Sequence, residues 1–491
     1  MASSSRIHPA VPLVPFAEGS DAAAPGSEPS PAASPAGRRL LLRRSALGVG
    51  AAAFAGLLFG APSARAATAR AATAGVAAHA PEASPAVIRT PGDQHVTFTR
   101  FTGTGFRRGT HKAIGWQPDG IRMGPHPVPR NYTDTFVDGA TPVGYEQSTW
   151  TSPPVPTAFG LTELIASWDV ETPGKTWVEV LVRGHDETGT LTGWFVLGRW
   201  CAKDPADGGA IHRTSVDNQA TDVATVYTDT FHAFLPHSLH DFQLRIHLLR
   251  PAGTRQSPLV RILGAVASGL PDLTTVPVSP VGRAAGRVID VPTFSQEVHI
   301  GHYPQWDNGG EAWCSATSSA MVLKHWGVGP TAADLAWVQP PVDAEVDFSA
   351  RNVFDYTYDG CGNWPFNTAY AGRYGLEAFV TRLRSFTELE ELVRVGIPVI
   401  ISVSFKKGDL DGAGYGTNGH LMVVVGFTPQ GDVVVNDPAS HLIADDGRVR
   451  TTYRRDQLEN AWVPHSGGTV YVVHPRSIRL PRTLVPCEPN W

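Results

Sequence analysis

The sequence has few cysteines, no excess of positive charge and no long apolar run, and each shortage excludes a class of protein. Its 491 residues include four cysteines, and none of them forms a C-x-x-C pair, so a cysteine-type structural zinc site is not expected. The formal net charge is −5, which does not fit the basic footprint of a nucleic-acid binder. Beyond residue 66, no stretch of about 18 apolar residues occurs, so no membrane-spanning helix is expected there.

The N-terminal segment has the pattern of an export signal. Arg38-Arg39 with further basic residues resembles a twin-arginine motif, and an apolar stretch from Ala46 to Ala61 follows it. Ala64-Arg65-Ala66 has the form of a cleavage site. We therefore predict a disordered n-region with a signal peptide over residues 1–66, export by the twin-arginine machinery, and a secreted or cell-wall-associated protein.

The next part of the chain reads as β-structure. Residues 67–86 are rich in Ala, Thr and Pro and are expected to be a linker. In residues 87–271, short alternating runs such as His95–Phe101 and Phe242–Leu249 are separated by turn residues, with no obvious long helix between them. This pattern predicts an all-β sandwich domain of unknown role.

The second half has a different pattern. Residues 272–286 are expected to be a second linker, because Pro, Val, Gly and Ala dominate them. From there to residue 480 the sequence predicts an α+β domain. We expect helices from about Cys314 to Trp326 and from Thr387 to Val395, followed by strands over 398–403, 420–425 and 432–436.

Cys314 and His420 are the candidate nucleophile and base. Cys314 follows a glycine pair and opens the predicted helix, where the unpaired N–H groups and the helix dipole favour a thiolate. His420 follows Gly419 and begins a strongly apolar strand, which would support the imidazole rigidly within reach of a thiol. The alternatives are a buried structural cysteine and a packing histidine. If Cys314 is catalytic, at most one disulfide can form among Cys201, Cys361 and Cys487.

A third group is expected to orient His420. Asp437 ends the strand after His420, and a short turn over residues 428–431 would bring it beside the histidine. Asn436 is a competitor, because an amide can do the same. Since side chains alternate along a strand, only one of the two can face His420.

Further candidates surround the cysteine. Gln296 and Gln305 both precede Cys314, and either side-chain amide could complete an oxyanion hole with the backbone N–H of Cys314. For substrate binding we single out Trp313, Asn363 and Trp364, the last two in an unusual Asn-Trp-Pro-Phe block. A packed loop anchor is the alternative interpretation of that block.

These motifs together resemble a known family. The segment from Val291 to Gly327, the Gly419-His420 block and Asn436-Asp437-Pro438 are similar to the bacteriocin-processing (double-glycine) peptidase-like branch of the papain-like cysteine peptidases. The resemblance covers about residues 288–475. It implies a papain-like fold with Cys314, His420 and Asp437 as the triad and Gln296 as the oxyanion glutamine. Ser315 stands where the family often has glycine. Because the chain has no Walker loop, processing of leader peptides does not carry over.

The expected activity is hydrolysis of peptide or amide bonds through a thioester, with no metal or other cofactor. Variants of this chemistry are a cell-wall peptide amidase and a peptidyl transferase. A catalytically silent protein that binds glycan or protein is the rival from another class. The expected partners are a peptide or protein substrate and a cell-wall or glycan ligand of the N-terminal domain, with no nucleic acid.

Overall fold

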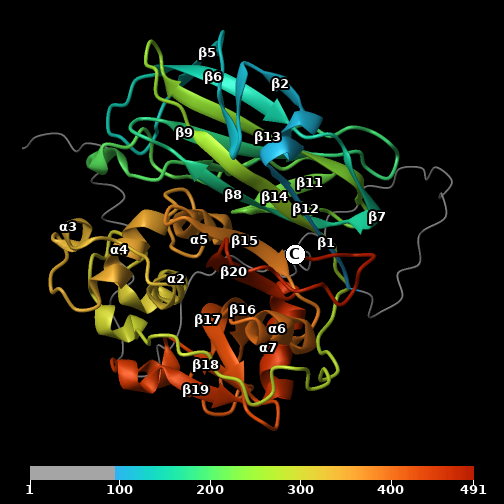
Figure 1. Ribbon diagram of the computed structural model, residues 1–491, viewed down its shortest axis with the longest axis vertical. Coiled ribbons are helices and arrows are strands. Elements are labelled where there is room, and N and C mark those ends of the chain that lie inside the picture. Colours follow the sequence, from blue (N-terminus) through green and yellow to red (C-terminus); the bar gives the residue numbers. More distant parts are fainter. Residues whose placement is uncertain (1–93) are drawn as a thin grey trace, which may run out of the picture. The chain divides into compact units, whose positions relative to one another are not determined.

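Two antiparallel sheets form the N-terminal half of the chain in the computed structural model, which describes residues 94–491 (Figure 1). The predicted signal peptide (1–66) and linker (67–86) lie outside the described residues. The first sheet has the order β11-β12-β8-β14-β4-β3, with β1 also paired to β14. Its strands are β1 (His95–Thr102), β3 (Ile114–Gln117), β4 (Gly120–Met123), β8 (Glu163–Glu171), β11 (Ala224–Tyr227), β12 (Thr230–Ala233) and β14 (Leu259–Gly269).

The second sheet packs against the first through aromatic side chains. Its order is β10-β9-β13-β6-β2, with β5 paired to β6 and β7 to β13. Phe101 of β1 meets Trp150 of β6 at 5.1 Å between ring centroids. The prediction of a β-rich N-terminal region is confirmed, and the alternating runs named above lie on β1 and β13. The strands are β2 (Thr110–Lys112), β5 (Val128–Tyr132), β6 (Val143–Thr151), β7 (Val155–Leu161), β9 (Trp177–Arg183), β10 (Phe195–Trp200) and β13 (Leu239–Pro251).

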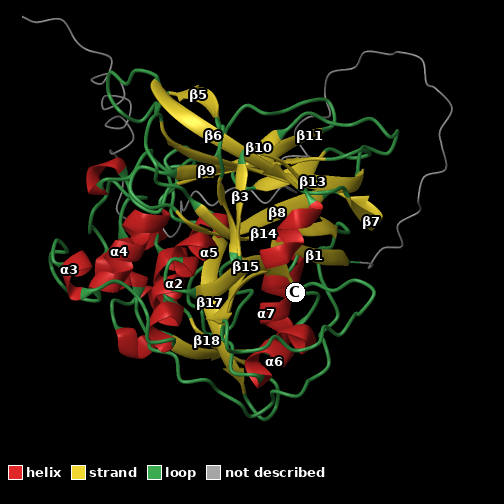
Figure 2. Cartoon of the chain, turned by 45° about the horizontal axis from the view of Figure 1, so that its top comes forward, coloured by secondary structure: helices red, strands yellow, loops and turns green. Residues whose placement is uncertain are grey.

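A third antiparallel sheet organises the C-terminal half, in the order β15-β20-β16-β17-β18-β19. Its strands are β15 (Leu376–Arg382), β16 (Val399–Phe405), β17 (Thr417–Phe427), β18 (Val433–Asn436), β19 (Arg450–Tyr453) and β20 (Thr469–Pro475). Figure 2 shows α2, α4 and α5 on one side of this sheet and α6 and α7 on the other. The helices are α2 (Cys314–His325), α3 (Ala332–Leu335), α4 (Ala344–Val353), α5 (Trp364–Gly372), α6 (Phe386–Arg394) and α7 (Arg455–Ser466).

The predicted helices and strands of this half coincide with α2, α6, β16, β17 and β18 to within a few residues. Helix α2 ends before Gly327, whose φ of +67° suits glycine as a helix terminator. The helices α3, α4, α5 and α7 were not predicted from the sequence. No helix among residues 94–491 is long and apolar enough to cross a membrane.

The two halves share buried contacts. Glu163 of β8 pairs with Arg382 of β15 at 2.6 Å, with both side chains nearly buried. Trp168 and Trp200 of the β-sheets pack against Phe366 of α5, at 6.2 and 5.3 Å between ring centroids. One cluster of buried apolar side chains therefore runs through both halves. The segment predicted as the second linker (272–286) is fixed as well, because Ala284 is buried and its N–H donates to Glu390 of α6.

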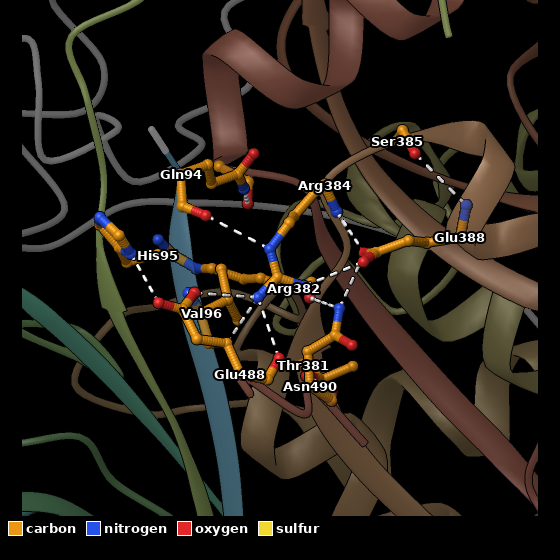
Figure 3. A network of polar contacts seen from close by, with 11 residues as sticks. Gln94, His95, Val96, Thr381, Arg382, Arg384, Ser385, Glu388, Glu488 and Asn490 are labelled. Atoms are coloured by element: carbon orange, nitrogen blue, oxygen red, sulfur yellow. Dashed lines mark hydrogen bonds and ion pairs between the residues drawn. The ribbon is translucent and has the colours of Figure 1, made fainter. Parts of the chain in front are cut away.

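The C-terminal segment ties the beginning of β1 to the third sheet (Figure 3). The carboxylate of Glu488 lies 2.7 Å from Nδ1 of His95 and 3.2 Å from Nη2 of Arg384. Nδ2 of the buried Asn490 donates to the carbonyl of Arg382 and to the carboxylate of Glu388. The contact between His95 and Glu488 joins residues 393 positions apart, so this segment adds to the linkage between the halves.

Candidate active site

Cys314 occupies the first position of α2, at the end of a tightly closed loop. The loop requires the glycine pair: Gly309 has a φ of +96°, and a Cβ on Gly310 would lie 2.3 Å from the carbonyl oxygen of Gln296. The Cys314 side chain is 7% exposed and the cysteine is free. The thiol thus lies at the start of α2, where the first N–H groups have no partner within the helix, and it keeps limited access to solvent.

His420 and Asp437 meet as the sequence predicted. His420 lies in β17, and Asp437 directly follows β18, its antiparallel neighbour. Nε2 of His420 is 2.8 Å from Oδ1 of Asp437, and both side chains are buried. Asn436 points the other way and donates to the carbonyls of Val291 and Pro292, as strand alternation demands.

Helix α2 lies directly against the strand that carries His420. Ser318, one turn after Cys314, donates from Oγ to the carbonyl of Leu421 at 3.1 Å. The second ring nitrogen of His420, Nδ1, is buried and makes no well-directed hydrogen bond within residues 94–491. Cys314 is among the groups that act electrostatically on this imidazole. Nδ1 is therefore the nitrogen left for exchange of a proton with the thiol.

The charges in this pair stabilise each other. Burial lowers the pKa of His420, but the charge and hydrogen bond of Asp437, with a contribution from Cys314, outweigh burial and raise the pKa to about 10. Burial raises the pKa of Asp437, yet the imidazolium and the hydrogen bonds to the carboxylate outweigh it and leave the pKa lowered. An imidazolium facing a carboxylate is the favoured state at neutral pH.

Two tyrosines hold the Asp437 carboxylate, and sequence reasoning missed both. The hydroxyl of Tyr453 in β19 donates to Oδ2 at 2.6 Å, and the hydroxyl of Tyr415 reaches both oxygens at 2.9 and 3.1 Å. The backbone N–H of Ala439 adds a bond at 3.1 Å to Oδ1. With its lone pairs engaged in this way, the carboxylate can keep its charge without contact with water.

The two candidate glutamines differ in position. Gln296 begins the short 3-10 helix Gln296–His299 and is 1% exposed, and its Nε2 donates to the carbonyl of Glu311 at 2.9 Å. Its amide therefore lies against the loop that ends at Cys314, and it also bonds to the side chain of Glu297. Gln305 is exposed in the turn that follows. Burial also raises the pKa of the neighbouring Glu297 to about 7, and the charge of His420 opposes this rise.

Two of the predicted substrate-binding side chains have structural positions instead. Trp313 is fully buried and donates from Nε1 to the carbonyl of Trp306. Asn363 is also fully buried, and its side chain caps α5 by accepting from the N–H of Phe366. Neither side chain is exposed for a substrate to contact. Trp364 is partly exposed, and its binding role stays a prediction.

Ser315, which departs from the family pattern, has a partner of its own. Its Oγ lies 2.9 Å from the hydroxyl of Tyr471 in β20, and both residues are buried. The serine thus joins the start of α2 to strand β20 of the third sheet. A glycine could not form this bond.

Comparisons with known proteins divide the chain in two. Residues 96–268 match the Peptidase C39 N-terminal domain, and residues 288–470 match the Peptidase_C39 like family. None of the curated proteins compared with the chain matches it.

Two solved structures, of the Gt and Gx strains of infectious bursal disease virus, are 12% and 11% identical, with TM-scores of 0.14 and 0.13. Each match covers 38% of this chain, and the chain spans about half the length of those viral chains, 53% and 54%. Scores this low carry no argument about fold or function.

Proposed function

We propose that the chain hydrolyses peptide or amide bonds with Cys314 as nucleophile, a proposal that the match of residues 288–470 to the Peptidase_C39 like family supports. The observation that carries the proposal is the buried His420–Asp437 pair, which leaves Nδ1 of the imidazole beside the start of α2. Asp437 fixes the orientation of the ring and stabilises its charged form. The pair therefore has the form of a base that is held ready for a thiol.

The proposed reaction proceeds in two halves. His420 holds the proton of Cys314, and the thiolate attacks the carbonyl carbon, so that a C–S bond forms and the electron pair of the C=O bond moves to oxygen. When the tetrahedral intermediate collapses, the C–N bond breaks and the imidazolium gives its proton to the leaving amine. Water then attacks the thioester while His420 accepts a proton. A C–O bond forms and the C–S bond breaks, so the acid is released and the thiolate–imidazolium pair is restored.

We assign the oxyanion hole to Gln296 and the backbone N–H of Cys314. Gln296 is buried and bonded to the loop that carries the cysteine, whereas Gln305 is exposed. A donor held in place before the reaction needs no reorganisation when the charge develops on oxygen.

The proposal includes export through the twin-arginine route and a cell-wall or glycan ligand for the N-terminal domain. The export part of the proposal is based on the arginine pair and on the Ala64-Arg65-Ala66 pattern. In protein recovered outside the cells, N-terminal sequencing is expected to show that the chain begins after Ala66.

Retention of the Cys314→Ala protein on purified cell walls, and its release by soluble glycan, would test the ligand of the N-terminal domain.

The experiment that tests the peptidase activity is hydrolysis of a mixed peptide library under reducing conditions. We expect cleavage by the protein and by a Cys487→Ala control, which lacks only the exposed cysteine. Cleavage should vanish with Cys314→Ala, because the nucleophile is lost. If none of the three proteins cleaves and Cys314 is not alkylated quickly, the peptidase proposal fails and a binding role replaces it.

A further inference from the structure

A second cluster of titratable side chains lies between the segment that follows Gln296 and helix α4, and the proposed reaction does not use it. Nδ1 of His299 is 3.0 Å from Oδ2 of Asp347, and Nδ1 of His302 is 3.0 Å from Oδ1 of the same carboxylate. The side chains of His299 and Asp347 are fully buried, and that of His302 is 13% exposed. Ligand atoms of all three lie within 4.8 Å of one another.

The hydrogen bonding of the His299 side chain is incomplete. Its Nδ1 is close to Asp347, but the two groups are not aligned for a hydrogen bond. Both ring nitrogens of His299 and Oδ2 of Asp347 are buried without a hydrogen-bond partner in the described chain. Such groups are rare in folded proteins, because an unpaired buried polar atom is costly. Ligand atoms that lie this close together, several of them without a hydrogen-bond partner, fit a bound cation.

The electrostatic surroundings favour positive charge. The ion-pair partners of Asp347 within residues 94–491 are the two imidazoles, so no Lys or Arg of that part neutralises it. Two more carboxylates, Asp343 and Asp446, share a hydrogen bond, and Asp343 interacts with His299. A divalent ion would compensate the charge of this buried carboxylate.

We propose that His299, His302 and Asp347 bind a divalent transition-metal ion, best fitted by Zn²⁺. Two imidazoles and one carboxylate are a ligand set that zinc commonly takes, with water in the fourth position. This inference is independent of the peptidase proposal, because none of the three residues belongs to the triad.

The position of the cluster gives the ion a role in holding the active-site loop. His299 ends the short helix that begins with Gln296, and Asp347 lies in the first turn of α4. The ion would therefore tie the segment bearing the proposed oxyanion donor to a neighbouring helix. It would act as a positioning element and take no part in the chemistry at Cys314.

Metal titration of a Cys314→Ser protein tests the proposal, since the substitution removes the nucleophilic thiol as a rival ligand. The protein is freed of metal with a chelator and titrated with Zn²⁺ and, separately, with Co²⁺. We expect one equivalent to bind and to raise the unfolding temperature. Co²⁺ should give visible ligand-field bands without the charge-transfer band of a thiolate ligand.

Variants in the same background locate the ion. Asp347→Asn and His302→Gln should each weaken binding by more than the roughly 10–100-fold that loss of an outer-shell partner costs, because each removes a direct ligand. His325 lies on α2, outside the cluster, so the His325→Gln variant should still bind one equivalent of metal ion. His302 is partly exposed, so its variant should fold even if Asp347→Asn does not.

Two results overturn the proposal. One is the absence of stoichiometric binding by the Cys314→Ser protein, which keeps all three ligands and needs no further variant. The other is binding that persists in His302→Gln, which would place the ion elsewhere, for example at Cys487. In either case the cluster is a His–Asp–His contact without metal.

Discussion

Nε2 of His420 lies 2.8 Å from Oδ1 of Asp437, with the imidazole 1% exposed and the carboxylate fully buried. His420 lies in β17 and Asp437 directly follows β18, its antiparallel neighbour, so the sheet holds the two residues close together. Because the pair is held in this way, the imidazole is already oriented as a base before each turnover.

The stability of the protein and its activity should both depend on pH through this pair. Because the pKa of His420 is raised to about 10, its contribution to stability is complete below the unfolded value of about 6.5 and disappears as pH rises toward 10. The lowered pKa of Asp437 works in the other direction. Its contribution is present above about pH 4 and is lost as pH falls through the folded value.

We therefore expect the descending limb of kcat/KM well above pH 8 for the unaltered protein. In Asp437→Asn the limb should move at least about one unit lower, since the largest group that raises the pKa of His420 loses its charge. The pH–rate profiles of both proteins check this. A limb near pH 6.5 in the unaltered protein would contradict the proposed electrostatics.

The two glutamines can be separated by a matched pair of variants. Gln296→Ala should lower kcat by about 10²–10³-fold, the usual effect of losing one oxyanion donor, with little change in KM. Gln305→Ala should have almost no effect, because its side chain is exposed in the turn. Steady-state kinetics on one cleaved peptide suffices. The opposite ranking would transfer the role to Gln305.

Tyr453→Phe should destabilise the protein by about 1.5–3 kcal/mol, because it removes a buried hydrogen bond to a charged group. Tyr370→Phe is the control. Its hydroxyl is equally buried, but it bonds to the neutral hydroxyls of Ser349 and Tyr374 and should cost about 1 kcal/mol. Urea unfolding at neutral pH measures both. Equal losses would mean that Asp437 does not carry its charge in the folded protein.

The contact between the two halves makes a further prediction. Arg382→Ala leaves Glu163 buried without its main partner and should cost about 3–5 kcal/mol. Burial raises the pKa of Glu163, but Arg382 and His232 outweigh it and lower the pKa to about 2, so this stability is present above about pH 4.3 and is lost toward pH 2.

A single cooperative unfolding transition is expected, because both halves share one core. Arg382→Met combined with Glu163→Met should recover much of the loss, since no buried charge is left unpaired. Two separate transitions, with Arg382→Ala affecting neither, would mean that the halves fold independently.

Local patterns predicted the centre of the site. The glycine before His420, the apolar strand after it and the alternation that separates Asn436 from Asp437 all act within a few residues. The contacts of Tyr415 and Tyr453 could not be foreseen, because they depend on pairing of β18 with β19 and on folding of a long loop.

Burial of the aromatic residues was equally hard to predict. Trp313 next to the cysteine resembled a binding residue, whereas the structure packs it inside, against Trp306. The capping role of Asn363 had a local signal, since an Asn shortly before a Pro is typical of a helix start. The spacing of His299 and His302 was visible as well, but Asp347 joins them only through tertiary packing.

The most direct test of the central claim is the rate at which each cysteine is alkylated by iodoacetamide at pH 6, followed by peptide mass spectrometry. Cys487 is exposed and serves as an internal reference, whereas Cys314 is only 7% exposed. If His420 keeps Cys314 as a thiolate, Cys314 reacts faster than Cys487 despite its burial, and His420→Gln removes the advantage. If Cys487 reacts first and His420→Gln changes nothing, Cys314 is an inert buried thiol and the account is wrong.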